Sequence, residues 1–480
     1  MTDQPPSLGR RDLTEGSVYG NLFHLAWPFA LGMMLHALYN VVDAWWLGRL
    51  SSEAIGAIGA SMPLVFLAIS LGMGFGHSGS ALISQHIGAR RPRRAYHVTG
   101  QLFLILACIA VAFAIPLAVF TRPLLRLYQL PEANMPETLG YLRIFVIGMP
   151  FIAMNIGYMS ALRSLGDTIT MVFINLVANL LNIALDPLFI FTAGLGTSGA
   201  ALASVICQIV AFCICVVLLR REHSGLSVRL ADLRPEFKVM RKIFDVALPA
   251  GIAVSNNSIG ILLFHVMVNA MGPTVLATFT IGNRVTQFVM FVGHAMAMAA
   301  APIVGQALGA GRPDLARRVV MVSVKLTAFG LIIPYALLTW KGPLVASFFT
   351  RDPAVVEEAA RFFLLVPFSN YLFVVFMVLS AAFYGSGHTR PVLYLAIIRN
   401  LLLRLPISFL LAILLGWGSM GLYIGFMSAN VVAAILTAWI FHRGRWLRAV
   451  VKTREDDEPE EEPPEDAEGV SGDESGPSVR

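Results

Sequence analysis

Charged residues are scarce in this chain of 480 residues: only 13% are Asp, Glu, Lys or Arg, whereas 56% are hydrophobic. A soluble globular protein carries about 25% charged residues, which cover the surface that faces water. A soluble enzyme, a nucleic-acid-binding protein and a disordered scaffold are therefore excluded. The composition predicts an integral membrane protein whose surroundings are the lipid bilayer, with no nucleic-acid partner.

Recognisable catalytic motifs are also missing. The four cysteines lie in apolar stretches without histidines at zinc spacing, so we expect them to serve packing alone. The glycine-rich turn at 309–311 is not followed by the lysine and serine of an ATP-binding loop. The sequence therefore predicts no enzyme, no cofactor and no metal beyond a possible sodium ion. Any transport that it performs must be driven by an ion gradient.

Long apolar runs make up most of the chain, and each can supply the roughly 20 residues that a helix needs to cross a bilayer. We place twelve membrane-spanning helices at 22–47, 56–84, 97–120, 140–162, 170–191, 197–219, 244–270, 275–307, 319–340, 361–385, 392–415 and 420–441.

Lys and Arg are concentrated in alternate loops, which predicts the orientation. With both termini in the cytoplasm, the inside segments hold 24 basic residues and the outside loops hold seven. Cytoplasmic loops of membrane proteins show this excess. We expect a multi-pass protein of the plasma (bacterial inner) membrane with both termini cytoplasmic.

The two halves of the chain repeat each other at one constant offset. The matched positions extend across four helix boundaries, further than chance apolar similarity would reach: Pro28 and Pro249, Gln85 and Gln306, Gly88 and Gly309, Gly166 and Gly387, Thr168 and Thr389, Asn179 and Asn400. Because each half has six helices, the halves share one topology. The predicted fold is an all-α integral membrane protein with two six-helix repeats (lobes), related by a pseudo-two-fold axis along the membrane normal.

This organisation divides the chain into five segments. They are a cytoplasmic N-terminal segment (1–21), the N-lobe (22–219), a cytoplasmic linker (220–243), the C-lobe (244–445) and a tail (446–480). The tail is first basic and then acidic, with 12 of the 29 acidic residues between Glu455 and Arg480. It has few apolar residues to bury, so we expect it to be disordered in the cytoplasm.

Two carboxylates, Asp43 and Asp186, are predicted to lie inside the membrane-spanning helices. An aspartate at a helix centre costs about 2.5–3.5 kcal/mol of insertion free energy, so its presence needs a functional reason. Each belongs to a polar stripe at helical spacing: His36, Tyr39, Asn40 and Asp43 on the first helix, and Asn175, Asn179, Asn182 and Asp186 on the fifth.

Two prolines are predicted to bend these helices. Pro28 and Pro187 have no N–H, so the carbonyls of His24 and Ile183 lose their helical donors. Free carbonyls, amides and carboxylates together make an all-oxygen site, which suits a hard cation or a proton. The alternative is that these polar side chains only hold helices together.

Other side chains are weaker candidates for a substrate cleft between the lobes. Methionines can form an adaptable wall for varied substrates, although packing in the core or against lipid is the alternative. The candidates are Met33, Met154, Met159, His265, Arg284, Met290 and Arg404.

Three arginines, Arg284, Arg399 and Arg404, fall inside predicted helices of the C-lobe. Arg399 is near the cytoplasmic end, so its side chain could extend to the membrane surface. Arg404 is roughly 16 Å into its helix, too deep for that. We expect Arg404 to face a water-filled cleft and to favour monocations, zwitterions or substrates with an anionic group.

Several segments together resemble the multidrug and toxic compound extrusion (MATE) family over residues 22 to about 445. They are the first helix WPFALGMMLHALYNVVDAWWLG, the repeated loops QHIGARRP and QALGAGRP, the loop RSLGDT, and the fifth helix NLVANLLNIALDPLFIF. The resemblance implies an exporter of organic cations and drugs, and we expect it to be a monomer. The resemblance further implies that inward proton or sodium flow drives two lobes, which rock about a central cleft.

The resemblance also implies which residues couple ion flow to export. These are Asp43 and Asp186, with Tyr39, Asn182 and Ser204. The polar stripe on the fifth helix adds Asn179 to the expected coupling site. The seventh and tenth helices are expected to carry no acidic residue, which favours a DinF-like branch with coupling in the N-lobe only.

Other functions remain as alternatives. A lipid-linked oligosaccharide flippase of the same superfamily is the nearest, although such proteins often have more helices and a more basic cavity. A membrane-embedded enzyme would need a nucleophile or a metal beside the aspartates, and a channel is disfavoured by the two lobes.

Overall fold

The computed structural model describes residues 12–50, 52–127, 132–221 and 225–451. In this part of the chain all regular elements are helices. The first six-helix bundle consists of α1 (Val18–Leu50), α2 (Ser52–Gly88), α3 (Pro92–Leu127), α4 (Met135–Ser164), α5 (Thr168–Pro187) and α6 (Gly196–Arg220), with the short helices η1 (Glu132–Asn134) and η2 (Leu188–Thr192).

A linker with the short helix η4 (Leu230–Leu233) leads to the second bundle. Its helices are α7 (Phe237–Ala270), α8 (Pro273–Gly309), α9 (Pro313–Phe349), α10 (Pro353–Ser386), α11 (Arg390–Ile397), α12 (Leu405–Phe409) and α13 (Gly418–His442). The π-helical segments η5 (Ile398–Arg404) and η6 (Leu410–Leu414) join α11 and α12 into one run, and η7 (Arg445–Leu447) follows α13.

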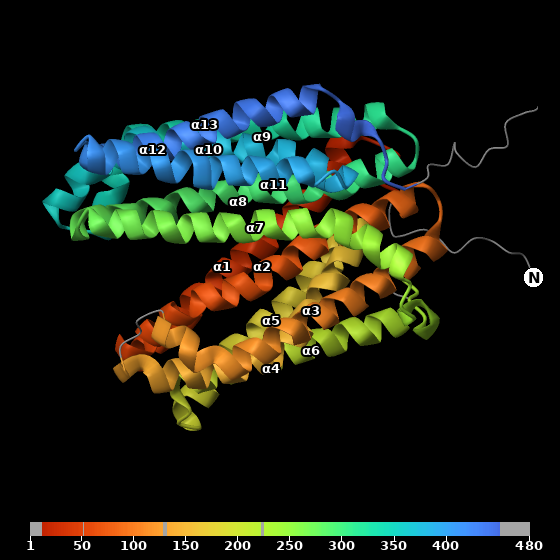
Figure 1. Cartoon of the computed structure of the whole chain (residues 1–480), viewed down its shortest axis with the longest axis horizontal. Helices are drawn as coiled ribbons and strands as arrows, with labels where there is room; N and C mark the ends of the chain where they lie inside the picture. Colours follow the sequence, from red (N-terminus) through yellow and green to blue (C-terminus); the bar gives the residue numbers. More distant parts are fainter. Residues whose placement is uncertain (1–11, 51, 128–131, 222–224, 452–480) are drawn as a thin grey trace, which may run out of the picture.

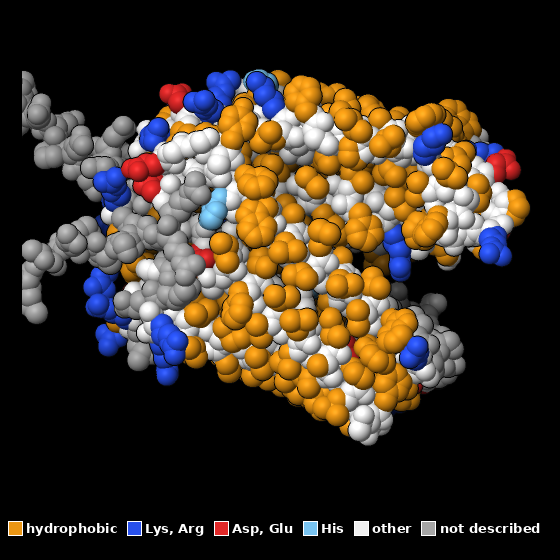
Figure 2. Space-filling view, turned by 180° about the vertical axis from the view of Figure 1, so that it is seen from behind, with side chains coloured by type: hydrophobic (Ala, Val, Ile, Leu, Met, Phe, Trp, Pro, Cys, Tyr) orange, Lys and Arg blue, Asp and Glu red, His pale blue; other side chains and the backbone are white. Residues whose placement is uncertain are grey.

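The predicted fold is confirmed. Among the described residues, eleven helical runs are long and apolar enough to cross a membrane, and α2 is the remaining span. Figure 2 shows apolar side chains along the middle of the molecule and Lys and Arg gathered toward its ends. Aromatic side chains such as Phe348 (87% exposed) are stable on that surface only when lipid covers them. The chain is a multi-pass membrane protein.

One expectation about acidic residues is wrong. Asp245 lies inside the range predicted for the seventh helix and belongs to α7. Helix α10 begins before the predicted residue 361, so it also contains Glu357 and Glu358. At α10 the extension begins at Asp352, whose carboxylate accepts from the Ala354 N–H at 2.9 Å. Asp245 is exposed, but Glu358 is 7% exposed.

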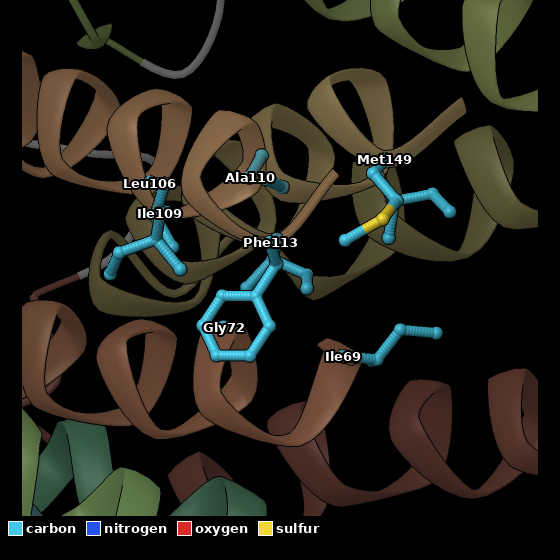
Figure 3. A pocket seen from close by; sticks show the side chains of 10 residues that line it. Ile69, Gly72, Leu106, Ile109, Ala110, Phe113 and Met149 are labelled. Atoms are coloured by element: carbon cyan, nitrogen blue, oxygen red, sulfur yellow. The ribbon is translucent and has the colours of Figure 1, made fainter. Parts of the chain in front are cut away.

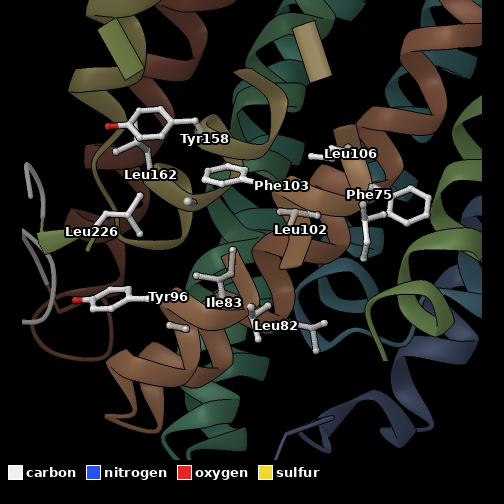
Figure 4. Close-up of a cluster of buried hydrophobic side chains, with 14 of the residues drawn as sticks. Phe75, Leu82, Ile83, Tyr96, Leu102, Phe103, Leu106, Tyr158, Leu162 and Leu226 are labelled. Atoms are coloured by element: carbon white, nitrogen blue, oxygen red, sulfur yellow. The ribbon is translucent and has the colours of Figure 1, made fainter. Parts of the chain in front are cut away.

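The two bundles meet at one end of the molecule and part at the other (Figure 1). At the closed end each bundle contributes to the core of the other. Leu22 and Leu25 of α1 pack with Ile303 of α8 in the second bundle. Ile243 and Ala247 of α7 pack in the first bundle, within the cluster that includes Leu82, Phe103 and Leu162 (Figure 4). Helix α1 therefore belongs to both bundles.

Repeat-related glycines let α2 and α8 cross at the closed end. A Cβ added to Gly88 would collide with the carbonyl oxygen of Gln306, and one added to Gly309 would collide with that of Gln85. Backbones can approach this closely only without side chains between them.

The glutamines of the repeat also reach across the crossing. Gln85 Nε2 donates to the carbonyls of Gly385 and Ser386 at 3.2 and 3.0 Å. Gln306 Nε2 donates to the Ser164 carbonyl at 2.7 Å. Ser164 and Gly385 are themselves separated by the offset of the repeat, so the repeat makes the same contact twice.

Candidate functional site

The centre of the candidate site is the end of α5. Asp186 and Asn182 are 0% and 2% exposed and lie one turn apart. Directly after Asp186, Pro187 ends the α-helix, and the chain continues as the π-helical segment η2. Because Pro187 has no N–H, it cannot donate to the Ile183 carbonyl, as the sequence predicts.

Helices α1 and α6 bring further polar groups to this place. The Tyr39 hydroxyl of α1 lies 3.3 Å from the Ser204 hydroxyl of α6. One turn further along α6, the Cys207 thiol lies close to the Asn182 side chain and to the Asp186 carboxylate. Three helices therefore converge here, and the structure brings Asn182, Asp186, Tyr39 and Ser204 into one region of the first bundle.

Cys207 is a member of this group that the sequence analysis missed. It is 3% exposed and was expected only to pack. The signal was its position three residues after Ser204, which places both side chains on one face of α6.

The side chains of the polar stripe on α5 differ in burial and in their partners. Asn179 is half-buried, whereas Asn175 is exposed and donates from Nδ2 to the Met171 carbonyl at 2.9 Å. Asp43 and Asn40 lie on α1, but their side chains are outside the described part of the structure. The pairing of Asp43 with Asp186 therefore stays a prediction.

Pro28 is buried inside α1, which continues without interruption across it. The His24 carbonyl, which loses its helical donor at this proline, accepts from the Thr168 hydroxyl at 3.4 Å. The repeat supplies a similar contact near Pro249, where Thr389 donates to the Val246 carbonyl. Side-chain donors of this kind make prolines tolerable in membrane helices.

The structure does not bring the candidates for the substrate cleft together around one described pocket. His265 is exposed with its ring edge-on to Phe279 at 5.2 Å, and Arg284 is exposed on α8. Met154 and Met159 pack against the core of the first bundle, and Met290 packs beside Tyr335 in the second. Met33 on α1 is half-buried.

The expectation that Arg404 faces a water-filled cleft is wrong, because Arg404 is 3% exposed. Its expected preference for substrates with an anionic group stays a prediction. Its guanidinium Nη2 donates to Asn430 Oδ1 of α13 at 3.5 Å and lies over the Phe426 ring at 4.3 Å. Arg399 does not extend to the membrane surface either, since it is also 3% exposed and donates to Asn257 and Asn430. The rotation of the π-helical segment η5 turns both side chains into the second bundle.

A separate pocket lies between α2, α3 and α4 (Figure 3). It is lined by Gly72 and by apolar side chains such as Leu106, Phe113 and Met149. With no polar side chain in its lining, it can hold an apolar group but cannot bind an ion.

Comparison with known proteins identifies the family. The MatE family model matches residues 28–188 and 249–410, two segments that begin at the repeated prolines. The chain belongs to the MatE family. Members of this family are transporters, so the protein is a transporter and not an enzyme. The matched segments contain Asp43, Asp186 and Arg404.

Relatives and solved structures agree with this family. The chain is 26% identical to the "Probable multidrug resistance protein YoeA" of Bacillus subtilis, over 91% of this chain and 96% of the relative. It is 25% identical to the "FAD transporter" of Shewanella oneidensis, over 83% and 89%. It resembles the outward-facing conformation of a multidrug resistance MATE family transporter with a TM-score of 0.84 and 26% identity, over 91% of this chain and 98% of that chain.

Proposed function

We propose that this MatE protein is a secondary active multidrug efflux transporter. It exchanges protons or sodium ions for organic cations or drugs, and it needs no cofactor. The names of several relatives support multidrug substrates, and the relative named as an FAD transporter extends the range to anionic molecules. The observation that carries the proposal is Asp186, a fully buried carboxylate on a membrane-spanning helix.

Asp186 can couple ion flow to export because an uncompensated charge is costly in the buried interior. Without water, an ionised carboxylate must be compensated by a proton or by a cation with oxygen ligands. Asn182 is beside it, and the Tyr39–Ser204 pair offers hydroxyl oxygens. Asp43 and Asn179 complete the proposed ion site. A proton would neutralise one carboxylate, whereas sodium would need the carboxylates ionised.

Helix α1 is the proposed transmission element. It carries Tyr39 near the ion site, while Leu22 and Leu25 lie in the core of the second bundle. If the ion site has a different affinity for the ion in two positions of α1, ion binding shifts the populations of these positions. Pro28 is a place where α1 can bend between them. Pro187 is the corresponding place where α5 can bend. Ion binding in the first bundle is thereby linked to the relative position of both bundles.

The closed end is proposed to face the cytoplasm. It carries the basic loop at Arg90–Arg94 and the linker 220–243, which the positive-inside rule places inside. The cleft then opens outward, both termini are cytoplasmic, and the membrane is the bacterial inner membrane. The five-segment division and a monomeric state stay predictions. Most of the tail lies outside the described residues.

Reconstituted liposomes test the coupling. Efflux of a fluorescent organic cation is measured first under a pH gradient without sodium and then under a sodium gradient. We expect Asp186→Asn and Asp43→Asn each to abolish gradient-driven efflux at equal protein incorporation, because neither amide can change its charge. Asp245→Asn is the matched control, since this aspartate is exposed on α7, and it should transport like the parent. If Asp186→Asn transports at the parent rate, Asp186 is not the coupling residue.

A further inference from the structure

The second bundle contains a buried cluster of guanidinium and amide groups around η5. Arg399 donates from Nη2 to Asn257 Oδ1 and from Nη1 to Asn430 Oδ1, the latter at 3.3 Å. Arg404 shares the same Asn430 oxygen at 3.5 Å. Asn430 is held in place because its Nδ2 donates to the Ser369 hydroxyl at 2.9 Å. Two cations therefore donate to one neutral oxygen.

The cluster has more donors than acceptors. Each guanidinium carries five N–H groups, and the Nε of Arg399 and of Arg404 are buried without an acceptor. The Nδ2 groups of Asn256 and Asn400 are also buried and unpartnered, and these residues are 6% and 0% exposed. One acceptor, Asn400 Oδ1, is buried without a partner as well, so four such donors stand against one such acceptor. Unsatisfied donors from α7 and η5 thus accompany two positive charges.

No carboxylate of the described residues pairs with either arginine. Glu358 is the buried carboxylate of this bundle, and it accepts from the Tyr423 hydroxyl and from Arg361. Aromatic rings supply partial compensation: Arg399 lies over Phe373 and Arg404 over Phe426, both at 4.3 Å. A ring face attracts a cation but does not replace the N–H bonds that an anion's oxygens accept. The cluster therefore carries two positive charges that no carboxylate of the described residues balances.

The repeat shows that this charge is opposite to that of the first bundle. At the offset that relates Pro28 to Pro249, Arg404 corresponds to Ile183, and Asn400 corresponds to Asn179 of the acidic stripe. Equivalent segments thus hold a carboxylate in one bundle and guanidiniums in the other. The backbone differs between the equivalent segments, because η5 corresponds to α-helical residues 177–183 of α5, whereas the repeat equivalent of η2 is η6. The π-helical turns of η5 are thus particular to the second bundle, and such turns often occur at functional sites. Asn257 is half-buried, so the cluster reaches the surface of α7 through its bond to Arg399.

We propose that Arg399 and Arg404, with Asn400, bind the phosphate or carboxylate group of a transported organic molecule. The planar guanidinium fork matches two oxygens of such a group. The rings of Phe264, Phe373, Phe376 and Phe426 line the same region and suit an aromatic portion of the molecule. The site would be reached when α7 moves relative to α13. The inference rests on the proposed function only in treating the bound molecule as a transport substrate.

Two flavins test the phosphate contact. FMN and riboflavin share one ring system and one ribityl chain and differ by a phosphate. Their binding to the full chain in phosphatidylcholine nanodiscs is measured by fluorescence anisotropy. We expect FMN to bind the parent about tenfold more tightly than riboflavin, as a charge-assisted contact allows. Arg404→Gln and Arg399→Gln should each reduce FMN binding to the riboflavin level and leave riboflavin unchanged.

Two further variants keep the test decisive. Arg390→Gln removes an exposed arginine at the start of α11 and should keep the FMN preference. Asn430→Asp adds a carboxylate where both guanidiniums already donate, so the protein should fold and lose the preference. This variant answers the question even if the arginine variants fail to fold.

Equal binding of FMN and riboflavin by the parent would overturn the proposal, as would an unchanged preference in Asn430→Asp. A third outcome is that chloride alone raises the melting temperature of the parent but not of Arg404→Gln, and abolishes the FMN preference. The site would then hold an inorganic anion, and the substrate assignment would be wrong. Because binding needs no gradient, a failure of ion coupling would leave these results unchanged.

Discussion

At the scale of single residues, buried charges in the second bundle depend on their partners. Glu358 is held from two sides: the Tyr423 hydroxyl donates to Oε1 at 3.0 Å, and Arg361 Nη1 donates to Oε2 at 3.3 Å. Tyr423 is fully buried, whereas the side chain of Arg361 is 53% exposed. The inner partner should therefore matter more than the outer one.

Replacing these two partners separately should show the difference. Tyr423→Phe leaves a buried carboxylate oxygen without its donor and should cost about 1–3 kcal/mol of unfolding free energy. Arg361→Gln breaks an ion pair that water already screens and should cost about 0–1 kcal/mol. Thermal unfolding of the purified protein in one detergent compares them. A larger loss of stability in Arg361→Gln would contradict this account of Glu358.

At the scale of helices, the contact between α2 and α8 depends on two glycines of the repeat. Gly88 and Gly309 have no side chain, and each packs against the backbone of a glutamine on the other helix. Glycine does not have this role at every position, since a Cβ at Gly330 on α9 would meet no atom within 4 Å. Glycine is needed at these two positions because the helices cross closely there, and not because the helices need it to form.

An added methyl group at the crossing should therefore force the two helices apart. We expect Gly309→Ala to lower the stability of the protein by about 1–3 kcal/mol, the range for overpacking a tight contact. Gly330→Ala is the matched control on a neighbouring helix and should not lower stability, because Ala favours a helix by about 0.5–1 kcal/mol over Gly where there is room for the methyl group. Melting temperatures measured side by side check this, and identical values for the two variants would show that the crossing tolerates a side chain.

At the scale of the whole molecule, the closed end is held by the two glutamines of the repeat. Besides donating across the interface, Gln85 accepts from the Val450 and Val451 N–H groups, and Gln306 accepts from the Leu13 N–H. Each side chain thus joins a chain segment outside the spans to the opposite bundle. Both are at most 1% exposed, so water cannot replace these bonds.

Removing both side chains should loosen the closed end as a unit. In Gln85→Ala/Gln306→Ala we expect faster hydrogen–deuterium exchange in peptides that cover the ends of α2, α4, α8 and α10. Gln101→Ala is the control, because Gln101 is also buried but donates to the linker carbonyls of Asp232 and Arg234. It should speed exchange near the linker alone. Parent-like exchange in the double variant would mean that apolar packing by itself keeps this end closed.

The sequence by itself determined the twelve spans, the two-bundle repeat and the family. Apolar length and a constant offset are properties of the chain that packing does not change. It also indicated Asp186 as a candidate, because an aspartate in an apolar run is conspicuous without any partner, and the structure shows that this residue is buried. The identity of the groups around it was partly visible, since Asn182 follows helical spacing on the same helix.

The tertiary structure decided the matters that depend on helix rotation and helix ends. Cys207 joins Asp186 only because α6 presents that face to α5, and Glu358 enters α10 because a polar cap extends the helix. Arg404 turns from the expected cleft to Asn430, 26 residues away in sequence, because the π-helical backbone sets its direction. A pattern along one helix gives the spacing of its side chains, whereas the neighbouring helices determine which of them meet.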